Sequence, residues 1–298
     1  VLKELEQKGY TYKASVPEDA DAEERADAGD KGEAIWFRST QFGDAKDRVL
    51  VKANGDPTYT LPDIAYHKDK IERGFDICVN ILGADHYVQH QVVRHGVTAL
   101  GLDASKIHVI IVQIVHLLRG GEKVKMSSRK GDFETLDDLI DQTSADAVRY
   151  GLLARTSDSH LNFDLDLAVK QTNENPVYYI QYAHVRCAGI FREAALRGVT
   201  DDGADLNLLG DAEMAFLRKA LELGEVLELA ASHLEPHRVA FYALELANTF
   251  HPIFDNVRVL HSEVPPEVAK ARLRFYRAAQ VILKRVLRLM GMTAPEVM

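Results

Sequence analysis

The sequence predicts two domains, an α/β domain built on a parallel, doubly wound sheet and then an all-α bundle. In the first half, short apolar segments alternate with helical segments, which is typical of a parallel sheet covered by helices. After about Asp166 the strand-like segments stop, and apolar residues recur every three to four positions, as in packed helices. A chain of 298 residues with 46% hydrophobic content can bury a core in each domain.

Residues 1–57 are expected to form a β-rich, connecting part of the first domain. Three segments rich in strand-forming residues, 10–15, 34–39 and 48–52, flank an acidic stretch over 18–30 that we expect to be a loop. The chain begins with the pattern of a helix that ends at Gly9 and has no initiating methionine. We therefore expect a piece of a longer protein.

Residues 58–165 contain the alternation of strands and helices. A helix is expected over about 62–73, a strand over 77–82 and a second helix that stops at Gly101. An apolar strand over 107–115 then precedes a loop over 119–131. This stretch is expected to supply the parallel sheet.

Residues 166–298 are expected to form the helical bundle, and the clearest helix covers 267–290. Its apolar face is marked by Phe275, Ala279, Ile282, Val286 and Met290, and another face by Lys270, Arg274, Arg277, Lys284 and Arg288.

The charge of the chain is unevenly distributed. The net charge is −9, but no acidic residue interrupts the basic run from Lys270 to Arg288, so a local basic face exists inside an acidic protein.

The cysteines and the apolar runs indicate the compartment. Cys78 and Cys187 stand alone, which suits a reducing compartment. The longest apolar run is shorter than the ~20 residues of a membrane helix. We expect a cytoplasmic protein without a membrane partner.

The loop Gly121-Glu-Lys-Val-Lys-Met-Ser-Ser-Arg-Lys-Gly131 places four basic side chains and two hydroxyls just after a strand, where α/β proteins bind ligands. It resembles the Lys-Met-Ser-Lys-Ser signature of class I aminoacyl-tRNA synthetases. The resemblance implies catalytic roles for Lys125, Ser127, Ser128 and Arg129, and ATP contacts by Val124, Lys125 and Met126. Ser128 stands where the signature has its second lysine, and Arg129 or Lys130 is left to supply that charge.

A second cluster points to one member of that class. The segment Thr58-Tyr-Thr-Leu-Pro-Asp-Ile-Ala-Tyr-His-Lys-Asp-Lys70 resembles a signature of arginyl-tRNA synthetases. Tyr59 and Asp63 are four residues apart, so they share a helix face, and a carboxylate matches a guanidinium bidentately. The alternative for Asp63 is a residue that stabilises a helix N-terminus. The resemblance implies that Tyr59, Asp63 and His67 bind arginine.

Gly83-Ala84-Asp85-His86 follows a predicted strand and is similar to the synthetase segment that contacts the ribose of ATP. The resemblance therefore implies that Gly83, Asp85 and His86 bind ATP, whereas Ala84 replaces a glutamine that touches arginine in some relatives. His86 and His90 also have the spacing of a helical zinc pair, but Tyr87 stands where a metalloprotease has its general base. A zinc hydrolase is the alternative that this spacing leaves.

The segment Asn175-Pro-Val-Tyr-Tyr-Ile-Gln-Tyr-Ala-His-Val-Arg186 is close to a signature at the start of the anticodon-binding domain of the arginyl family. Its aromatic and cationic side chains at helical spacing suit unstacked RNA bases, although an aromatic stripe is more often core. The resemblance implies that tRNA is bound by Tyr179, Tyr182, Arg186, Phe254 and Met298.

The resemblance covers nearly the whole chain and implies the second half of a Rossmann-like catalytic domain followed by a helical anticodon-binding domain. It implies ligation of arginine to tRNA through arginyl-adenylate, with ATP and Mg²⁺ as substrate, no permanently bound cofactor, no metal site and a monomeric state. No His-Ile-Gly-His-like motif occurs in the chain, so we expect it to be inactive alone. The alternative is a noncatalytic, tRNA-binding relative.

Overall fold

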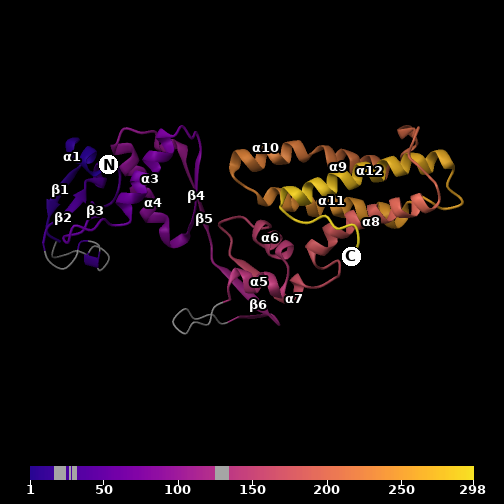
Figure 1. Ribbon diagram of the computed structural model, residues 1–298, viewed down its shortest axis with the longest axis horizontal. Helices are drawn as coiled ribbons and strands as arrows, with labels where there is room; N and C mark the ends of the chain where they lie inside the picture. The colour runs from indigo at the N-terminus through magenta and orange to yellow at the C-terminus, as the bar shows by residue number, and fades with distance from the viewer. Residues whose placement is uncertain (17–24, 27, 29–31, 125–133) are drawn as a thin grey trace. The chain divides into compact units, whose positions relative to one another are not determined.

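The computed structural model describes residues 1–16, 25, 26, 28, 32–124 and 134–298. They form two compact units, 1–114 and 115–298, each with its own hydrophobic core (Figure 1). No helix within these described ranges is both long enough and apolar enough to cross a membrane. The domain boundary predicted near residue 165 falls inside the second compact unit and stays a prediction.

The first unit contains two small sheets and two main helices. Its elements are α1 (Leu2–Gln7), β1 (Thr11–Ala14), β2 (Ala34–Phe37), β3 (Arg48–Val51), α3 (Thr60–Glu72), β4 (Cys78–Gly83), α4 (Tyr87–Ala99) and β5 (Ile107–Val112). The order β1-β2-β3 is antiparallel, whereas β4 and β5 pair in parallel with Cys78 opposite Ile107. The predicted β-rich start and the predicted parallel pair are therefore present.

Helices α3 and α4 pack closely because Gly96 has no side chain. A Cβ atom at Gly96 would lie 2.3 Å from the Cδ1 atom of Ile64, which is fully buried. Ile64 belongs to a core that also contains Leu5, Phe37 and Leu50. This contact fixes α3, which carries Asp63 and His67, against α4, which begins directly after Asp85 and His86.

The second unit begins with a mixed sheet and continues as a helical bundle. Its elements are β6 (Val115–Arg119), β7 (Glu122–Lys123), α5 (Leu136–Gln142), α6 (Ala145–Leu153), β8 (Leu161–Asp164), α7 (Leu165–Ala168), α8 (Pro176–Leu196), α9 (Asp211–Leu221), α10 (Leu223–His233), α11 (His237–Asn256) and α12 (Pro266–Leu289). Strand β6 pairs in parallel with β8 and antiparallel with β7. In the bundle core, Phe216, Phe250 and Phe275 make edge-to-face contacts.

One predicted strand is wrong in its extent. The apolar run expected as a single strand over 107–115 divides into β5, which pairs with β4, and β6, which begins at Val115 and joins the other sheet. Apolar periodicity marks strands but does not say which partner each half of a run will find. The predicted loop over 119–131 likewise begins with a short hairpin, since β7 pairs with β6.

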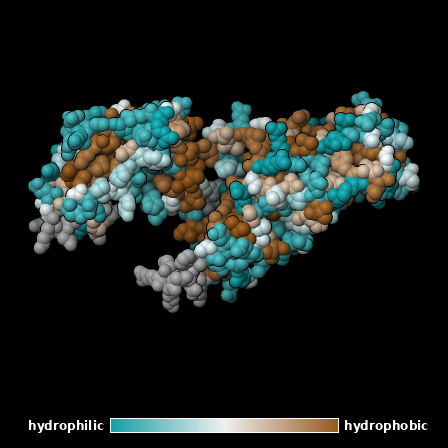
Figure 2. All heavy atoms as spheres, in the orientation of Figure 1, coloured by the Kyte–Doolittle hydropathy of each residue, from teal (hydrophilic) through white to brown (hydrophobic). Residues whose placement is uncertain are grey.

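The parallel pair β4–β5 exposes apolar side chains. Val79, Ile81 and Val112 are 40%, 68% and 39% exposed, and Figure 2 shows hydrophobic residues gathered over β4 and β5. Parallel strands are normally covered on both faces. This pair therefore has the composition of an interior sheet without a complete cover in this chain.

Candidate functional site

Tyr59 and Asp63 lie at the start of α3, as the spacing predicts. Tyr59 is the residue before the helix, and its carbonyl oxygen accepts a hydrogen bond of 3.3 Å from the backbone N–H of Asp63. Asp63 is in the first turn, where a carboxylate is favoured by the helix dipole. Both side chains line one pocket, so the helix-stabilising position of Asp63 does not remove it from the candidate site.

The pocket has a volume of about 460 Å³ and lies within the first unit. It is lined by Tyr59, Asp63, Tyr66, His67, Lys70, Asn80, Leu82, His86, Gln89, His90 and Val93. The three residues predicted to bind arginine therefore come together, and His86 joins them. The lining contains one carboxylate, Asp63, and one ammonium, Lys70, beside aromatic, polar and apolar side chains. The Asp63 carboxylate suits an organic cation with an apolar stem.

His67 is buried, and both of its ring nitrogens have protein partners. Nδ1 lies 2.7 Å from the carbonyl oxygen of Asp63, which can only accept, so Nδ1 carries the proton. Nε2 then accepts from the side-chain amide of Asn80 at 2.6 Å. His67 thus connects α3 to β4, and its predicted contact with arginine stays a prediction.

Two pocket residues, Asn80 and Gln89, had no signal in the sequence. The Asn80 amide oxygen accepts from the Lys70 ammonium at 3.2 Å, and that ammonium lies 4.3 Å from the centroid of the Tyr66 ring. Gln89 places its amide nitrogen 3.4 Å from a carboxylate oxygen of Asp63. The contacts of Asn80 with Lys70 and of Gln89 with Asp63 join residues from different elements, so only the fold could reveal them.

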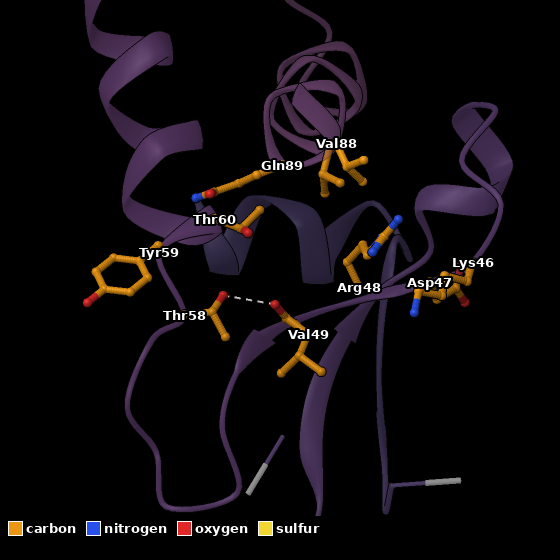
Figure 3. Close-up of a pocket in the computed structure, with 10 residues that line it drawn as sticks. Lys46, Asp47, Arg48, Val49, Thr58, Tyr59, Thr60, Val88 and Gln89 are labelled. Atoms are coloured by element: carbon orange, nitrogen blue, oxygen red, sulfur yellow. Dashed lines mark hydrogen bonds between the residues drawn. The ribbon is translucent and has the colours of Figure 1, made fainter. Parts of the chain in front are cut away.

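A second pocket of about 180 Å³ adjoins this one, because Tyr59 and Gln89 line both. It lies between β3, the start of α3 and α4, and in Figure 3 Gln89 extends from α4 toward the start of α3. The buried Thr58 hydroxyl donates to the carbonyl oxygen of Val49 at 2.8 Å. That bond ties the segment before Tyr59 to the sheet.

Gly83, Asp85 and His86 form the turn at the end of β4. A Cβ atom at Gly83 would lie 2.7 Å from the Oδ1 atom of Asp85, so glycine lets the Asp85 side chain fold back over the strand end. The Nδ1–H of the His86 ring donates to the amide oxygen of Gln89 at 3.2 Å. The turn lies at the carboxyl end of a parallel strand, where α/β proteins bind nucleotides, and the roles of these residues stay predicted.

The histidine pair gives the zinc alternative no support. His86 is bonded to Gln89, whereas His90 is buried between helices. Among the residues that the structure describes, no group of three or more His, Cys, Asp or Glu side chains could hold a metal ion.

Burial lowers the pKa of His90 to about 4, with smaller contributions from His67 and Arg94. Because this value lies below the usual 6.5, folding favours the neutral ring; the resulting stabilisation is present above pH 6.5 and is lost as the pH falls toward 4. We expect His90→Leu to reduce the pH dependence of stability in this window by up to about 1.4 kcal/mol per pH unit. Urea unfolding followed by the fluorescence of Trp36, the single tryptophan, measures this in the first unit.

The exposed His233→Leu change serves as the control, because His233 lies on α10 in the second unit. It should leave the pH profile seen by Trp36 unchanged. Identical profiles for wild type and the His90 variant would contradict a buried, neutral His90.

The signature loop is only partly described. The Val124 backbone N–H donates to the carbonyl oxygen of Leu117 at 2.9 Å, and its side chain packs on the core around Leu117. Lys125, Met126, Ser127, Ser128 and Arg129 lie outside the described residues. The predicted position after a sheet strand is confirmed for Val124, which directly follows β7.

The predicted tRNA residues gather around Arg186 on α8. Its guanidinium carbon lies 4.7 Å from the Tyr182 ring centroid and 4.4 Å from the Phe254 ring centroid. It also donates to Asp255 at 2.9 Å and to Nδ1 of His251 at 3.1 Å. The structure thus brings together three of the five residues and adds two that the sequence did not indicate.

His251 connects this cluster to Tyr179. Its Nε2 donates to the carbonyl oxygen of Tyr179 at 2.9 Å, and burial lowers the pKa of its ring, so the ring stays neutral and can accept from Arg186. Tyr178, which resembles a core residue in the sequence, is half-buried and stacks on Tyr182 with centroids 5.4 Å apart.

Met298 is half-exposed at the end of a tail that is fixed to α8. The carbonyl oxygens of Thr293 and Pro295 accept from Gln181 at 3.1 Å and from His184 at 2.7 Å. These contacts hold the tail on the helix that carries Tyr182 and Arg186, and the tRNA contact of Met298 stays a prediction.

Comparison with known proteins shows which family the chain resembles. Residues 180–298 match the DALR anticodon binding domain. The chain is 45% identical over 271 residues to an arginine–tRNA ligase of Heliobacterium modesticaldum, covering 88% of this chain and 48% of that protein. It is 42% identical to the corresponding ligase of Desulforamulus reducens, covering all of this chain and 50% of that protein.

Solved structures agree with the sequence relatives. A structure described as an arginyl-tRNA synthetase from Campylobacter jejuni is 33% identical, with a TM-score of 0.85 over 100% of this chain and 61% of that one. Thermus thermophilus arginyl-tRNA synthetase shares the fold, with a TM-score of 0.76 and 20% identity over 57% of its length. The chain spans about half the length of the curated relatives it matches. Both the helical domain and the high identity place it in the arginyl-tRNA synthetase family.

Proposed function

We propose that this chain is half of an arginine–tRNA ligase, which joins arginine to tRNA through an arginyl-adenylate. The observation that carries the proposal is the shared pocket of Tyr59 and Asp63, in a chain that is 42–46% identical to arginine–tRNA ligases. Because those relatives are all named as ligases, catalysis is favoured over the noncatalytic alternative.

Asp63 would pair with the guanidinium of arginine, because a carboxylate offers two acceptors to its planar donor fork. The aromatic rings of Tyr59 and Tyr66 would flank the aliphatic stem. His67, held by Asn80, would fix the turn of α3 that carries Asp63. Selection would then come from a site whose hydrogen bonds only arginine satisfies.

Gly83, Asp85 and His86 would hold the adenosine of ATP at the end of β4, and Val124 and Met126 would also bind ATP. Lys125, with Ser127, Ser128 and Arg129, would stabilise the charge that develops on pyrophosphate, and Mg²⁺ bound with ATP would share that task. In the helical domain, Tyr179, Tyr182, Arg186, Phe254 and Met298 would contact the anticodon loop. The partners would be tRNA, arginine and ATP, and the protein would be a cytoplasmic monomer.

We expect the chain alone to catalyse no measurable arginine-dependent exchange of pyrophosphate into ATP, even with tRNA present. The physical reason is the incomplete cover of β4–β5, whose apolar residues remain exposed, so that half of the nucleotide site has no scaffold. The measurement is pyrophosphate exchange by this chain and by the full-length protein under the same conditions.

The full-length protein should exchange with arginine and not with lysine or citrulline. Robust exchange by the chain alone would contradict the expected dependence on the missing half. Absence of arginine-dependent exchange by the full-length protein would remove the proposed function.

A further inference from the structure

The exposed face of α12 carries a basic stripe that is interrupted at Val281. With 3.6 residues per turn, Lys270, Arg274, Arg277, Lys284, Arg285 and Arg288 fall within about 100° of the helix circumference. Arg274, Arg277, Arg285 and Arg288 are exposed, and Val281 is the apolar residue among them. We call these six basic residues the α12 stripe.

The α12 stripe by itself destabilises the helix. Lys270–Arg274 and Lys284–Arg288 are like charges at the i,i+4 spacing, and such pairs destabilise a helix. No acidic residue occurs between Glu267 and Glu296. A chain with net charge −9 has thus concentrated positive charge on one helix face, which indicates an anionic partner.

The two ends of the stripe differ. At the N-terminal end, Asp201 neutralises part of the charge, since its carboxylate lies 2.8 Å from Nε of Arg274 and 2.9 Å from Nε of Arg277. At the other end, Lys284, Arg285 and Arg288 have no carboxylate within salt-bridge distance among the described residues of the chain.

Arg149 adds to the C-terminal end. Gly291 has a positive φ of 71°, and a Cβ atom there would lie 3.0 Å from the Arg149 guanidinium, so the arginine of α6 lies over the end of α12. Four basic side chains from two helices therefore surround this end of the stripe, whereas the apolar face of α12 is buried in the bundle core.

We propose that the α12 stripe binds the phosphate backbone of a double-helical RNA stem. Basic residues three or four positions apart recur about every 5 Å along a helix, which lets one row contact several phosphates of one strand. A membrane surface is disfavoured, because a helix that lies on lipid needs its apolar face free. The identification of this RNA as tRNA rests on the proposed function.

The stripe contacts a different part of the RNA from the Arg186 cluster. Phe254 of that cluster packs edge-to-face on Tyr276 of α12, with centroids 6.5 Å apart, and Tyr276 is buried on the side of α12 turned away from the stripe. Bases held at Arg186 therefore do not lie on the stripe, which adds affinity without reading sequence.

The test is the salt dependence of RNA binding by the whole chain. We expect the triple variant Lys284→Gln, Arg285→Gln, Arg288→Gln to lower the slope of log K against log[KCl] by about two to three and to weaken binding about 10- to 100-fold at 0.1 M salt. Fluorescence anisotropy would be recorded with an arginine-accepting tRNA, a second tRNA and a stem duplex without a loop. All three RNAs should lose affinity equally.

The matched control removes three charges from ion pairs elsewhere in the second unit. Lys170, Arg197 and Arg238 each pair with a nearby glutamate, so their change to Gln keeps the net charge equal to that of the triple variant. Equal slopes for the two variants would overturn the inference, as would the absence of duplex binding by wild type. The single Arg288→Gln change should lower the slope by about one.

Two further outcomes distinguish RNA binding by the α12 stripe from membrane binding and from the proposed function. Equal loss of binding to phosphatidylcholine–phosphatidylserine vesicles and to RNA would overturn the RNA assignment. A wild-type chain that does not prefer the arginine-accepting tRNA would contradict the proposed function. If the salt slopes of the triple variant and its control still differ as expected, RNA binding by the α12 stripe remains supported.

Discussion

Asp63→Asn in the full-length protein should lower kcat/KM for arginine by about 100- to 1,000-fold, mostly through KM. The change keeps the shape of the side chain but replaces a charged, bidentate acceptor by a neutral group with one acceptor, and charge-assisted hydrogen bonds contribute about 1.5–3 kcal/mol each. The measurement is tRNA-dependent pyrophosphate exchange at varied arginine concentrations. The variant should also discriminate less between arginine and citrulline, since the neutral side chain at position 63 no longer attracts the guanidinium charge.

Asp69→Asn is the matched control for this change. Asp69 lies on the same helix and pairs on the surface with Arg73 at 3.3 Å, where an ion pair contributes little. It should leave kcat/KM within about twofold of wild type. If the two variants behave alike, Asp63 does not bind the substrate, and the shared pocket with Tyr59 has another use.

Lys125→Ala should lower kcat of the full-length protein by about 100- to 1,000-fold while the dissociation constant for arginine stays unchanged. A preorganised donor that acts on charge developing in the transition state has an effect of this size on the rate and none on ground-state binding of the other substrate. Single-turnover formation of adenylate measures the first quantity, and equilibrium titration with arginine measures the second.

Lys123→Ala provides the control, because Lys123 is an exposed residue of β7 just before the signature. Arg129→Ala and Lys130→Ala in the same assay identify which cation replaces the lysine absent at Ser128. A normal rate for Lys125→Ala would contradict the assignment of the loop to pyrophosphate.

Much of the architecture could be predicted from the sequence, because burial leaves a local period. In α12, Phe275, Ala279 and Val286 are spaced four and seven residues apart and are all buried. Helix α3 ends within one residue of its predicted end, at the glycine that allows a positive φ. The resemblance of three short signatures also placed Tyr59 beside Asp63, and Tyr182 beside Arg186, before any coordinates.

The sequence determined the helices, the β-rich start, the parallel pair and the family, because period, glycine stops and signatures are local properties of the chain. The tertiary structure decided the rest. It divided the apolar run over 107–115 between two sheets, engaged both nitrogens of His67 and placed Arg186 between two rings with His251 and Asp255 beside it. Each of these arrangements includes a partner that is 13 to 69 residues away in the sequence or lies in another sheet. The periodicity of the sequence does not show which distant side chain will make a given hydrogen bond.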